Sequence, residues 1–257
     1  MINKAEILII SKYLKPKDRD GFLKVISNFS FIGIMLGVAT LIIVMSLMNG
    51  FRIELFDKLL THQPHISYMS SGNYEFEKNT ILKLSKKNKI KITDINLVKN
   101  SEALILTKKN NFGVLIKSFR KDEINSNYFL KNSIIRGKIE RKGIGVGLEL
   151  ANKLSLNVGD VITLLSNNTE TTPFGLIPRQ LNFTINYIFN TGMYEFDSNF
   201  IITNLDQGKS ISKKKNEIEI RINDPDKAIF FTKVLKQNDS DKFVYSWVDT
   251  NKTFFDA

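Results

Sequence analysis

The sequence predicts an α+β domain with mixed or antiparallel sheets and short helices, preceded by one transmembrane α-helix. Three observations lead to this prediction. The interval 25–51 holds no charged side chain over its 27 residues. Several later segments alternate apolar and polar side chains with the period of two that is typical of half-buried strands. Between them, a few short segments carry apolar residues three and four positions apart, which is the spacing of a helix face.

The apolar interval is long enough to cross a bilayer, because about 20 helical residues span the hydrocarbon core. Its central part, 31–48, holds ten Leu, Ile, Val or Phe residues. At roughly 0.3 to 0.6 kcal/mol each, they favour insertion by about 3 to 6 kcal/mol. A cleavable signal peptide would have a shorter apolar region and a small-residue cleavage site. We therefore predict a retained transmembrane helix over 25–51.

Basic residues flank this helix unequally. Only Arg52 and Lys58 follow it closely, whereas six basic residues precede it, namely Lys4, Lys12, Lys15, Lys17, Arg19 and Lys24. Because positively charged segments stay in the cytoplasm, residues 1–24 are predicted to be cytoplasmic and residues 52–257 to be exported.

Gly33 and Gly37 stand four positions apart in the same helix. Such a pair lets another helix approach closely, because no side chain separates the two backbones. Glycine is also common in membrane helices that make no such contact. A helix-packing site at this pair and an ordinary membrane helix are the two alternatives.

The elements after the apolar interval follow from local patterns. Apolar residues recur at helical spacing from Phe51 until Pro64, so the membrane helix is predicted to continue as an amphipathic stalk and to stop there. Residues 65–69 are predicted to form a strand, and 77–87 a short helix. Two apolar runs in 102–119, separated by a Lys/Asn turn, predict a β-hairpin.

The segment 143–166 ("GIGVGLELANKLSLNVGDVITLLS") predicts a strand, a short helix over 148–154, a turn and a second strand. The remaining predicted elements are strands within 181–190, 192–203 and 217–224 and a helix with an acidic N-cap over 224–237.

The stretch 167–180 carries two prolines, Pro173 and Pro178, on either side of an apolar tip. Because proline fixes φ and lacks an N–H, we predict a projecting loop of fixed shape. Exposed apolar loop tips commonly mark partner sites. A linker whose apolar residues fold back onto the core is the alternative, and the pattern alone leaves both open.

The composition excludes several kinds of chemistry. The chain has no cysteine, which excludes disulfides, thiolate zinc sites and cysteine nucleophiles. The glycines of 143–147 follow G-x-G-x-G, which is neither the dinucleotide nor the P-loop pattern. No hydrolase or metalloprotease motif is present. We therefore predict that the chain is not an enzyme and takes no cofactor.

Three further features receive structural interpretations. His62 and His65 have Pro64 between them and no third ligand nearby, so no metal site is predicted. Glu195 and Asp197 have no partner for acid–base chemistry nearby, which favours a structural role. The net charge of +11 comes from scattered lysines without interleaved aromatic residues. This favours solvated surfaces over a site for nucleic acid or anionic lipid.

Four stretches together resemble the permease subunits of lipoprotein-releasing ABC transporters, the LolC/LolE family, within a wider MacB-like group. They are "SKYLKPKDRDGFLKVIS", "IMLGVATLIIVMSLMNGFRIELFDKLL", "GIGVGLELANKLSLNVGD" and "TPFGLIPRQ" followed by "GMYEFDS". Their order and spacing match across essentially the whole chain, which is more specific than any one stretch.

The resemblance implies an inner-membrane protein with a periplasmic MacB-like core domain over 52–257. One subdomain, formed by 52–100 and 195–257, would be split in sequence around an inserted subdomain, 101–194. Three more membrane helices would follow in such a permease. We therefore expect this sequence, which ends at Ala257, to be a fragment, a truncated product or half of a split subunit.

The resemblance also implies a function, namely the release of lipoproteins from the inner membrane to a periplasmic chaperone and the outer membrane. The implied partners are a cytoplasmic ABC ATPase subunit that hydrolyses ATP, a second permease subunit, the chaperone, lipoprotein substrates and membrane lipid, with no nucleic acid. A single-span anchored adaptor and another kind of MacB-like permease are the alternatives.

Two sets of residues take roles from the resemblance. A hook that recruits the chaperone would consist of Pro173, Phe174, Gly175, Leu176, Ile177, Pro178, Arg179 and Gln180. The wall of an acyl-chain cavity would include Val44, Met45, Met48 and Phe51. Flexible methionine side chains suit lipid tails of variable shape, and plain contact with the bilayer is the alternative.

Overall fold

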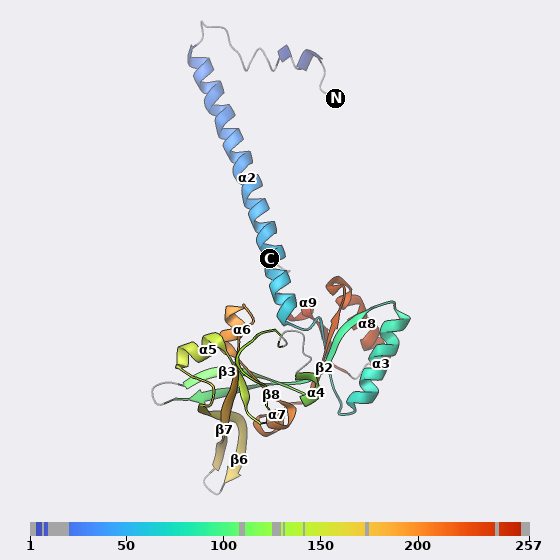
Figure 1. Ribbon diagram of the computed structural model, residues 1–257. Helices are drawn as coiled ribbons and strands as arrows, with labels where there is room; N and C mark the ends of the chain where they lie inside the picture. The colour runs from blue at the N-terminus through green and yellow to red at the C-terminus, as the bar shows by residue number, and fades with distance from the viewer. Residues whose placement is uncertain are drawn as a thin grey trace. The chain divides into compact units, whose positions relative to one another are not determined.

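The computed structural model describes residues 4–6, 8–9, 21–107, 111–124, 130, 132–140, 142–172, 175–239 and 242–252. The chain divides into two compact units, Met1–Asp57 and Lys58–Ala257 (Figure 1). The first unit consists mainly of one long helix, and the second contains every strand of the described chain.

Helix α2 (Gly21–His62) contains the apolar interval. Its segment Val25–Arg52 has a mean hydropathy of 2.5, and none of the segment is buried in the protein. At 1.5 Å per residue, its 28 residues measure about 42 Å, which exceeds the roughly 30 Å of a hydrocarbon core. By length and composition α2 can therefore cross a membrane, and it is not a buried core helix of the described chain.

Helix α2 ends two residues before Pro64, as the sequence predicts. The last carbonyl groups of a helix have no partner inside the helix. Here the guanidinium of Arg221 donates a hydrogen bond of 2.9 Å to the Leu60 carbonyl and one of 2.6 Å to the Thr61 carbonyl. A positive charge is also favourable at a helix C-terminus, so Arg221 caps this end of α2.

The strands of the described chain join one hydrogen-bonded sheet. They are β1 (Ile66–Met69), β2 (Ile92–Leu106), β3 (Asn111–Phe119), β4 (Ile134–Gly137), β5 (Ile144–Gly147), β6 (Val161–Thr172), β7 (Gly175–Phe189), β8 (Phe200–Asn204), β9 (Glu217–Ile222) and β10 (Val244–Ser246). Their order in space is β10-β1-β9-β2-β3-β8-β5-β7-β4, and β6 pairs with both β2 and β7.

The helices of the second unit are short. They are α3 (Tyr74–Lys87), α4 (Lys121–Ile124), α5 (Leu148–Leu154), α6 (Tyr194–Asn199), α7 (Leu205–Ile211), the 3-10 turn η1 (Pro225–Lys227), α8 (Ala228–Asn238) and α9 (Trp247–Thr250). The strand, helix and strand predicted in 143–166 are confirmed as β5, α5 and β6. The predicted hairpin of 102–119 is confirmed by the antiparallel pairing of β2 with β3.

At one end of the sheet, β10, β1, β9 and the first half of β2 pair antiparallel. Helices α3 and α8 contact each other beside these strands (Figure 1). Helix α8 buries Ala228, Phe231 and Leu235, the residues whose helical spacing predicts its inner face. Helix α3 buries Ile81, so each of the two helices has a buried apolar face.

Strand β2 changes partners along its length. Residues 92–98 pair with β9, and residues 103–106 pair with β6. Because β6 also pairs with β7, β7 with β5, β5 with β8 and β8 with β3, six strands close into a ring. All six contribute to one apolar cluster, through Ala103, Ile105, Val114, Ile116, Ile144, Val146, Ile162, Leu164, Phe183, Ile185 and Ile201. This cluster is the core of the ring.

The strand pairing bears on the predicted split subdomain without fixing its boundaries. Strand β1 and the first half of β2 pair with β9 from the far end of the sequence, so distant segments do come together. Strand β8, which begins at residue 200, pairs instead with β3 and β5 of the ring. The boundaries at 100 and 195 therefore stay a prediction.

Candidate functional site

A two-stranded ribbon extends from the ring of strands. Strands β6 and β7 pair in the ring through 161–165, skip register at a bulge, and pair again from Thr169 with Pro178 to Thr172 with Gly175. None of the other described strands pairs with this outer part. We call residues 167–180 the ribbon, and Figure 1 shows it projecting beyond the sheet.

The ribbon carries the predicted hook. Gly175, Ile177, Pro178, Arg179 and Gln180 are exposed, and the Ile177 side chain is 50% exposed although it is apolar. Two predicted members, Pro173 and Phe174, and the side chain of Leu176 lie outside the described residues. The described members therefore share one projecting segment and do not fold back onto the core.

The local chemistry explains a ribbon where the sequence predicts an irregular loop. Gly175 has φ +114, in the region that favours glycine, so the return strand can begin there. Pro178 cannot donate to a ladder, and proline is therefore tolerated only on edge strands. Since the ribbon has just two strands, both of them are edges.

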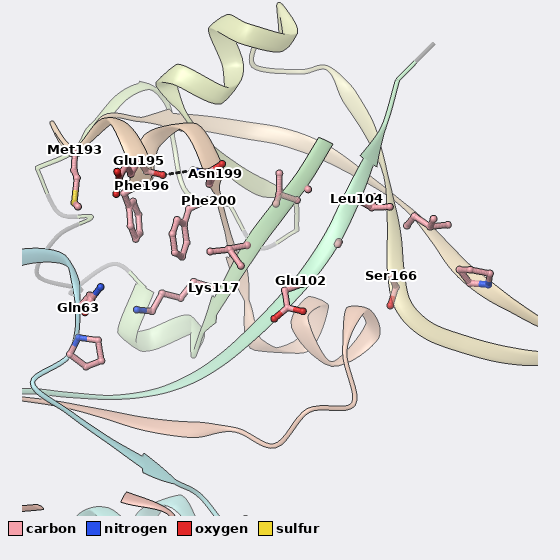
Figure 2. A pocket seen from close by; sticks show the side chains of 17 residues that line it. Gln63, Glu102, Leu104, Lys117, Ser166, Met193, Glu195, Phe196, Asn199 and Phe200 are labelled. Atoms are coloured by element: carbon pink, nitrogen blue, oxygen red, sulfur yellow. Dashed lines mark hydrogen bonds between the residues drawn. The ribbon is translucent and has the colours of Figure 1, made fainter. Parts of the chain in front are cut away.

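A groove of about 700 Å³ lies on the outer face of β2 and β3 (Figure 2). Leu104 and Leu115 form its floor, and they alternate with the residues that fill the ring. The other lining residues come from β2 and β3 themselves, from α6 and its flanks, from the base of the ribbon and from the segment after α2. They are Gln63, Pro64, Glu102, Ala103, Gly113, Val114, Lys117, Leu165, Ser166, Pro178, Met193, Glu195, Phe196, Asn199 and Phe200.

The groove is apolar with few charged groups. The rings of Phe196 and Phe200 stack with their centroids 3.9 Å apart, and Figure 2 shows both beside Lys117. The Lys117 ammonium forms a buried ion pair of 2.9 Å with Glu219. Glu102 pairs at 2.9 Å with Lys214 at the surface. The lining therefore offers an apolar wall beside an ammonium group that an ion pair holds in place.

A second hollow of about 280 Å³ continues the groove toward β10 and shares Leu115, Lys117 and Phe200 with it. Tyr245 lines this hollow and donates a hydrogen bond of 3.1 Å to Glu217. Burial, together with the Glu217 charge, raises the pKa of Tyr245 to about 12. Tyr245 is therefore a neutral hydrogen-bonding group at physiological pH.

Asp197 has the structural role that the sequence favours. Its carboxylate is buried and accepts hydrogen bonds from the Thr191 N–H at 2.9 Å and from the Thr191 hydroxyl at 2.9 Å. A Cβ on Gly147 would lie 2.1 Å from the Asp197 carbonyl. This glycine of the 143–147 run therefore permits close contact between β5 and α6, which positions one wall of the groove.

His65 is also structural. Its Nδ1 accepts a hydrogen bond of 3.2 Å from the Ile222 N–H, and burial, with the nearby charge of Arg221, lowers its pKa to about 4. The His62 side chain lies outside the described residues. Among the residues that are described, no group of three or more His, Asp or Glu side chains has a metal-binding arrangement.

The predicted membrane residues all lie on α2, in the first unit. Val44, Met45, Met48 and Phe51 are exposed. Nothing lies within 4 Å of a Cβ placed on Gly33 or Gly37. Both sets are thus accessible to lipid or to another helix, and their roles stay predictions.

Sequence reasoning missed the groove. The signal that was available is the run "ALIL" in β2, where Leu104 interrupts the alternation expected of a strand with one solvated face. Leu115 makes the same exception in β3, and both side chains are partly exposed. The contribution of α6 depends on tertiary packing and has no local signal.

Comparison with known proteins shows which proteins this chain resembles. No protein-family model matches the chain. The lipoprotein-releasing system transmembrane protein LolC of Neisseria meningitidis serogroup B is 28% identical over 257 residues, covering 96% of this chain and 61% of that protein. LolC of Haemophilus influenzae is 30% identical over 189 residues, covering 71% of this chain and 46% of that protein. The chain is similar in sequence to the LolC/LolE permease subunits over most of its length.

The chain is also similar to the lipoprotein-releasing system transmembrane protein LolE of Haemophilus influenzae. The two are 30% identical over 165 residues, which cover 60% of this chain and 39% of that protein. The chain thus spans about half the length of the LolC/LolE relatives it matches. The resemblance seen in the sequence is confirmed. The extracellular domain of the noncanonic ABC-type transporter YknZ from Gram-positive bacteria covers 71% of the chain with a TM-score of 0.41 and 8% identity, a likeness too remote to assign a fold.

Proposed function

We propose that this chain is part of a permease subunit of an ABC transporter that releases lipoproteins from the inner membrane. The main observation in support is that this chain, which is similar to LolC and LolE, has a projecting ribbon with an exposed apolar residue, Ile177. The released lipoprotein passes to a periplasmic chaperone and then to the outer membrane. A separate cytoplasmic ATPase and a second permease subunit complete the transporter.

The ribbon is the chaperone-docking hook in this proposal. Strand pairing from Thr169 to Thr172 and proline at Pro178 limit its conformations before binding, and a pre-ordered segment loses less entropy on association. Ile177 supplies an apolar contact, while Arg179 and Gln180 supply hydrogen-bonding groups next to it. Together they give an apolar contact with polar groups beside it.

The groove receives the exported part of the lipoprotein in the same proposal. It runs from Pro64, shortly after α2, to Pro178 at the base of the ribbon. Its apolar floor of Leu104 and Leu115 suits an acyl chain or an apolar peptide segment. Helix α2 anchors the subunit, with Val44, Met45, Met48 and Phe51 in contact with lipid and its N-terminus in the cytoplasm.

The hook is tested by measuring the affinity of the full chain, held in lipid nanodiscs, for the periplasmic lipoprotein chaperone. Ile177→Asp is expected to weaken binding at least tenfold, because a carboxylate would be desolvated in the interface. Val161→Asp is the matched control, since Val161 is an exposed residue of β6 outside the ribbon. Equal affinity of the Ile177→Asp variant and wild type contradicts the docking role.

Leu115→Glu separates the groove from the hook. This variant is expected to leave chaperone affinity unchanged and to reduce lipoprotein release by the assembled transporter. A loss of chaperone affinity in Leu115→Glu equal to that of Ile177→Asp would mean that the two sites are not separate.

One observation also fits a second function. The described residues contain one candidate membrane span, which is all that an anchored adaptor for an envelope protein requires. Copurification distinguishes the two functions. The permease proposal requires a stable complex with an ATPase and a second permease subunit, whereas the adaptor binds a chaperone without either.

A further inference from the structure

A second, separate feature of the Lys58–Ala257 unit is a basic hollow of about 290 Å³. Four lysines line it, together with the turn after β1 and one asparagine. We call it the lysine hollow, and its residues are Lys99, Lys209, Lys214, Lys215, Ser70, Ser71, Gly72 and Asn216. None of them lines the groove, and among them only Lys214 also lines the smaller hollow that adjoins the groove.

Lys99 is the unusual member. It is only 5% exposed, and its ammonium donates a hydrogen bond to the Lys214 carbonyl. Within the described part of the chain, no carboxylate lies within ion-pair distance of Lys99. Burial and the neighbouring charge of Lys209 lower its pKa. Taking an ammonium group out of water without a counter-charge costs free energy. Among the described residues, the buried charge of Lys99 therefore lacks a compensating negative charge.

The surroundings of Lys99 are built closely around it. A Cβ on Gly208 would lie 3.6 Å from the Lys99 side chain and 2.3 Å from the Ser118 hydroxyl, so this glycine lets α7 cover both. Ser118 is the cross-strand partner of Lys99, and Ser101 follows two residues later on the same face. Among the described residues, neither buried hydroxyl has a hydrogen-bond partner. Three neighbouring polar groups are therefore buried with incomplete compensation.

The carboxylates near the hollow are engaged elsewhere. Asp206 pairs with Lys209 at 3.6 Å, and Glu102 pairs with Lys214 at 2.9 Å, both at the exposed surface where such pairs are weak. Glu77, which accepts from the Ser70 hydroxyl, is held by Lys242 at 2.6 Å. This leaves Lys99 and Lys215 as two positive charges with no carboxylate partner within the described residues.

We propose that the lysine hollow binds a phosphate-type dianion. Two uncompensated ammonium groups match two negative charges, and lysine binds phosphate oxygens as a point charge. The volume of about 290 Å³ admits a phosphate group with its hydration but no large ligand. The same chemistry is available from a soluble phosphate group and from a phosphomonoester lipid headgroup. This inference does not depend on the proposed transport function.

The test uses the full chain in phosphatidylcholine nanodiscs, with its melting temperature measured in inorganic phosphate and in chloride at equal ionic strength. Phosphate at ten times its dissociation constant is expected to raise Tm by about 3 to 5 °C. Lys99→Met is expected to abolish this response and to raise Tm in chloride, because it removes the uncompensated buried charge. A purely structural Lys99, which only holds the Lys214 carbonyl, would instead give a lower Tm in chloride.

Two further variants keep the test decisive. Lys215→Gln, at the exposed rim, is expected to fold normally and to lose most of the phosphate response. Lys233→Gln removes an exposed lysine of α8 and is expected to keep the response. A second arm replaces part of the phosphatidylcholine with phosphatidic acid, and a Tm response confined to that arm assigns the site to a lipid headgroup. No response in either arm, or equal responses in wild type and Lys215→Gln, overturns the proposal.

Discussion

Gly147 illustrates how much one residue decides in this protein. Strand β5 and helix α6 approach so closely that a Cβ on Gly147 would lie 2.1 Å from the Asp197 carbonyl. In the sequence, the glycine-rich run 143–147 matches neither nucleotide-binding pattern. In the fold, its last glycine allows β5 and α6 to come into close contact. The residue type was informative, but its reason lies in a partner about 50 residues away, which local patterns do not identify.

Gly147→Ala is expected to destabilise the Lys58–Ala257 unit by about 1 to 3 kcal/mol, because the backbone atoms that a new methyl group would meet cannot rotate away. Urea unfolding measures this change. Gly113→Ala is the control, since its Cβ would meet only the Leu104 side chain, at 4.0 Å. Equal stability of the two variants would contradict the close contact between β5 and α6.

His65 gives the unit a stability that depends on pH. Its pKa is lowered from 6.5 to about 4 in the folded state, so acid protonates the unfolded chain first. Above pH 6.5 the imidazole is neutral in both states and has no effect. Stability is therefore expected to fall by as much as about 3 kcal/mol between pH 6.5 and pH 4.

His65→Asn tests this dependence by urea unfolding across the same pH range. The asparagine oxygen can accept the Ile222 N–H in place of Nδ1 but does not titrate. The variant is expected to lose the part of the acid sensitivity that lies between pH 6.5 and pH 4. An unchanged pH profile would show that other groups cause it.

At the scale of elements, the ribbon shows where sequence prediction succeeds and where it stops. The prolines correctly predict that the described part of 167–180 projects (Figure 1), and the fixed shape stays a prediction. They do not reveal that the arms pair as strands beyond a bulge at 165–169, because proline normally argues against strand. The groove was missed because it depends on contacts between α6 and β3. These contacts are tertiary, and the spacing of residues along the sequence does not predict them.

Gly175→Ala is expected to loosen the ribbon while the ring of strands stays intact. Its φ of +114 strains any residue with a Cβ, and such strain costs of the order of 1 kcal/mol. Hydrogen exchange should accelerate at the amides of 169–172 and 175–177, which lie in the paired part of the ribbon, and chaperone affinity should fall. Gly159→Ala is a matched control, because Gly159 has φ +98 in the turn before β6. It should lower Tm similarly and leave chaperone affinity unchanged.

For the whole molecule, the sequence predicts the fold class but does not predict that six strands close into a ring. Period-two alternation and turn residues give most strands, and the apolar interval gives α2, because these depend on neighbours along the chain. The ring depends on β2 leaving β9 after Val98 and meeting β6 from Ala103. That exchange of partners is a property of long-range packing, and family resemblance supplied only the expectation of two subdomains.

The absence of cysteine makes the proposed orientation directly measurable. Single cysteines at the exposed positions Lys4 and Val161 place one label site on each side of the apolar interval. A membrane-impermeant maleimide is expected to label Val161→Cys in spheroplasts and Lys4→Cys only after lysis. The reverse pattern would mean that the Lys58–Ala257 unit lies in the cytoplasm.

The two ends of the main strand order have a consequence for how copies of this protein meet. They are β10, with three residues, and β4, with four. Unpaired backbone at a sheet border is what lets proteins polymerise through strand addition, and short borders limit it. Copies of this protein are therefore expected to meet at these two borders through side-chain contacts and not through strand addition.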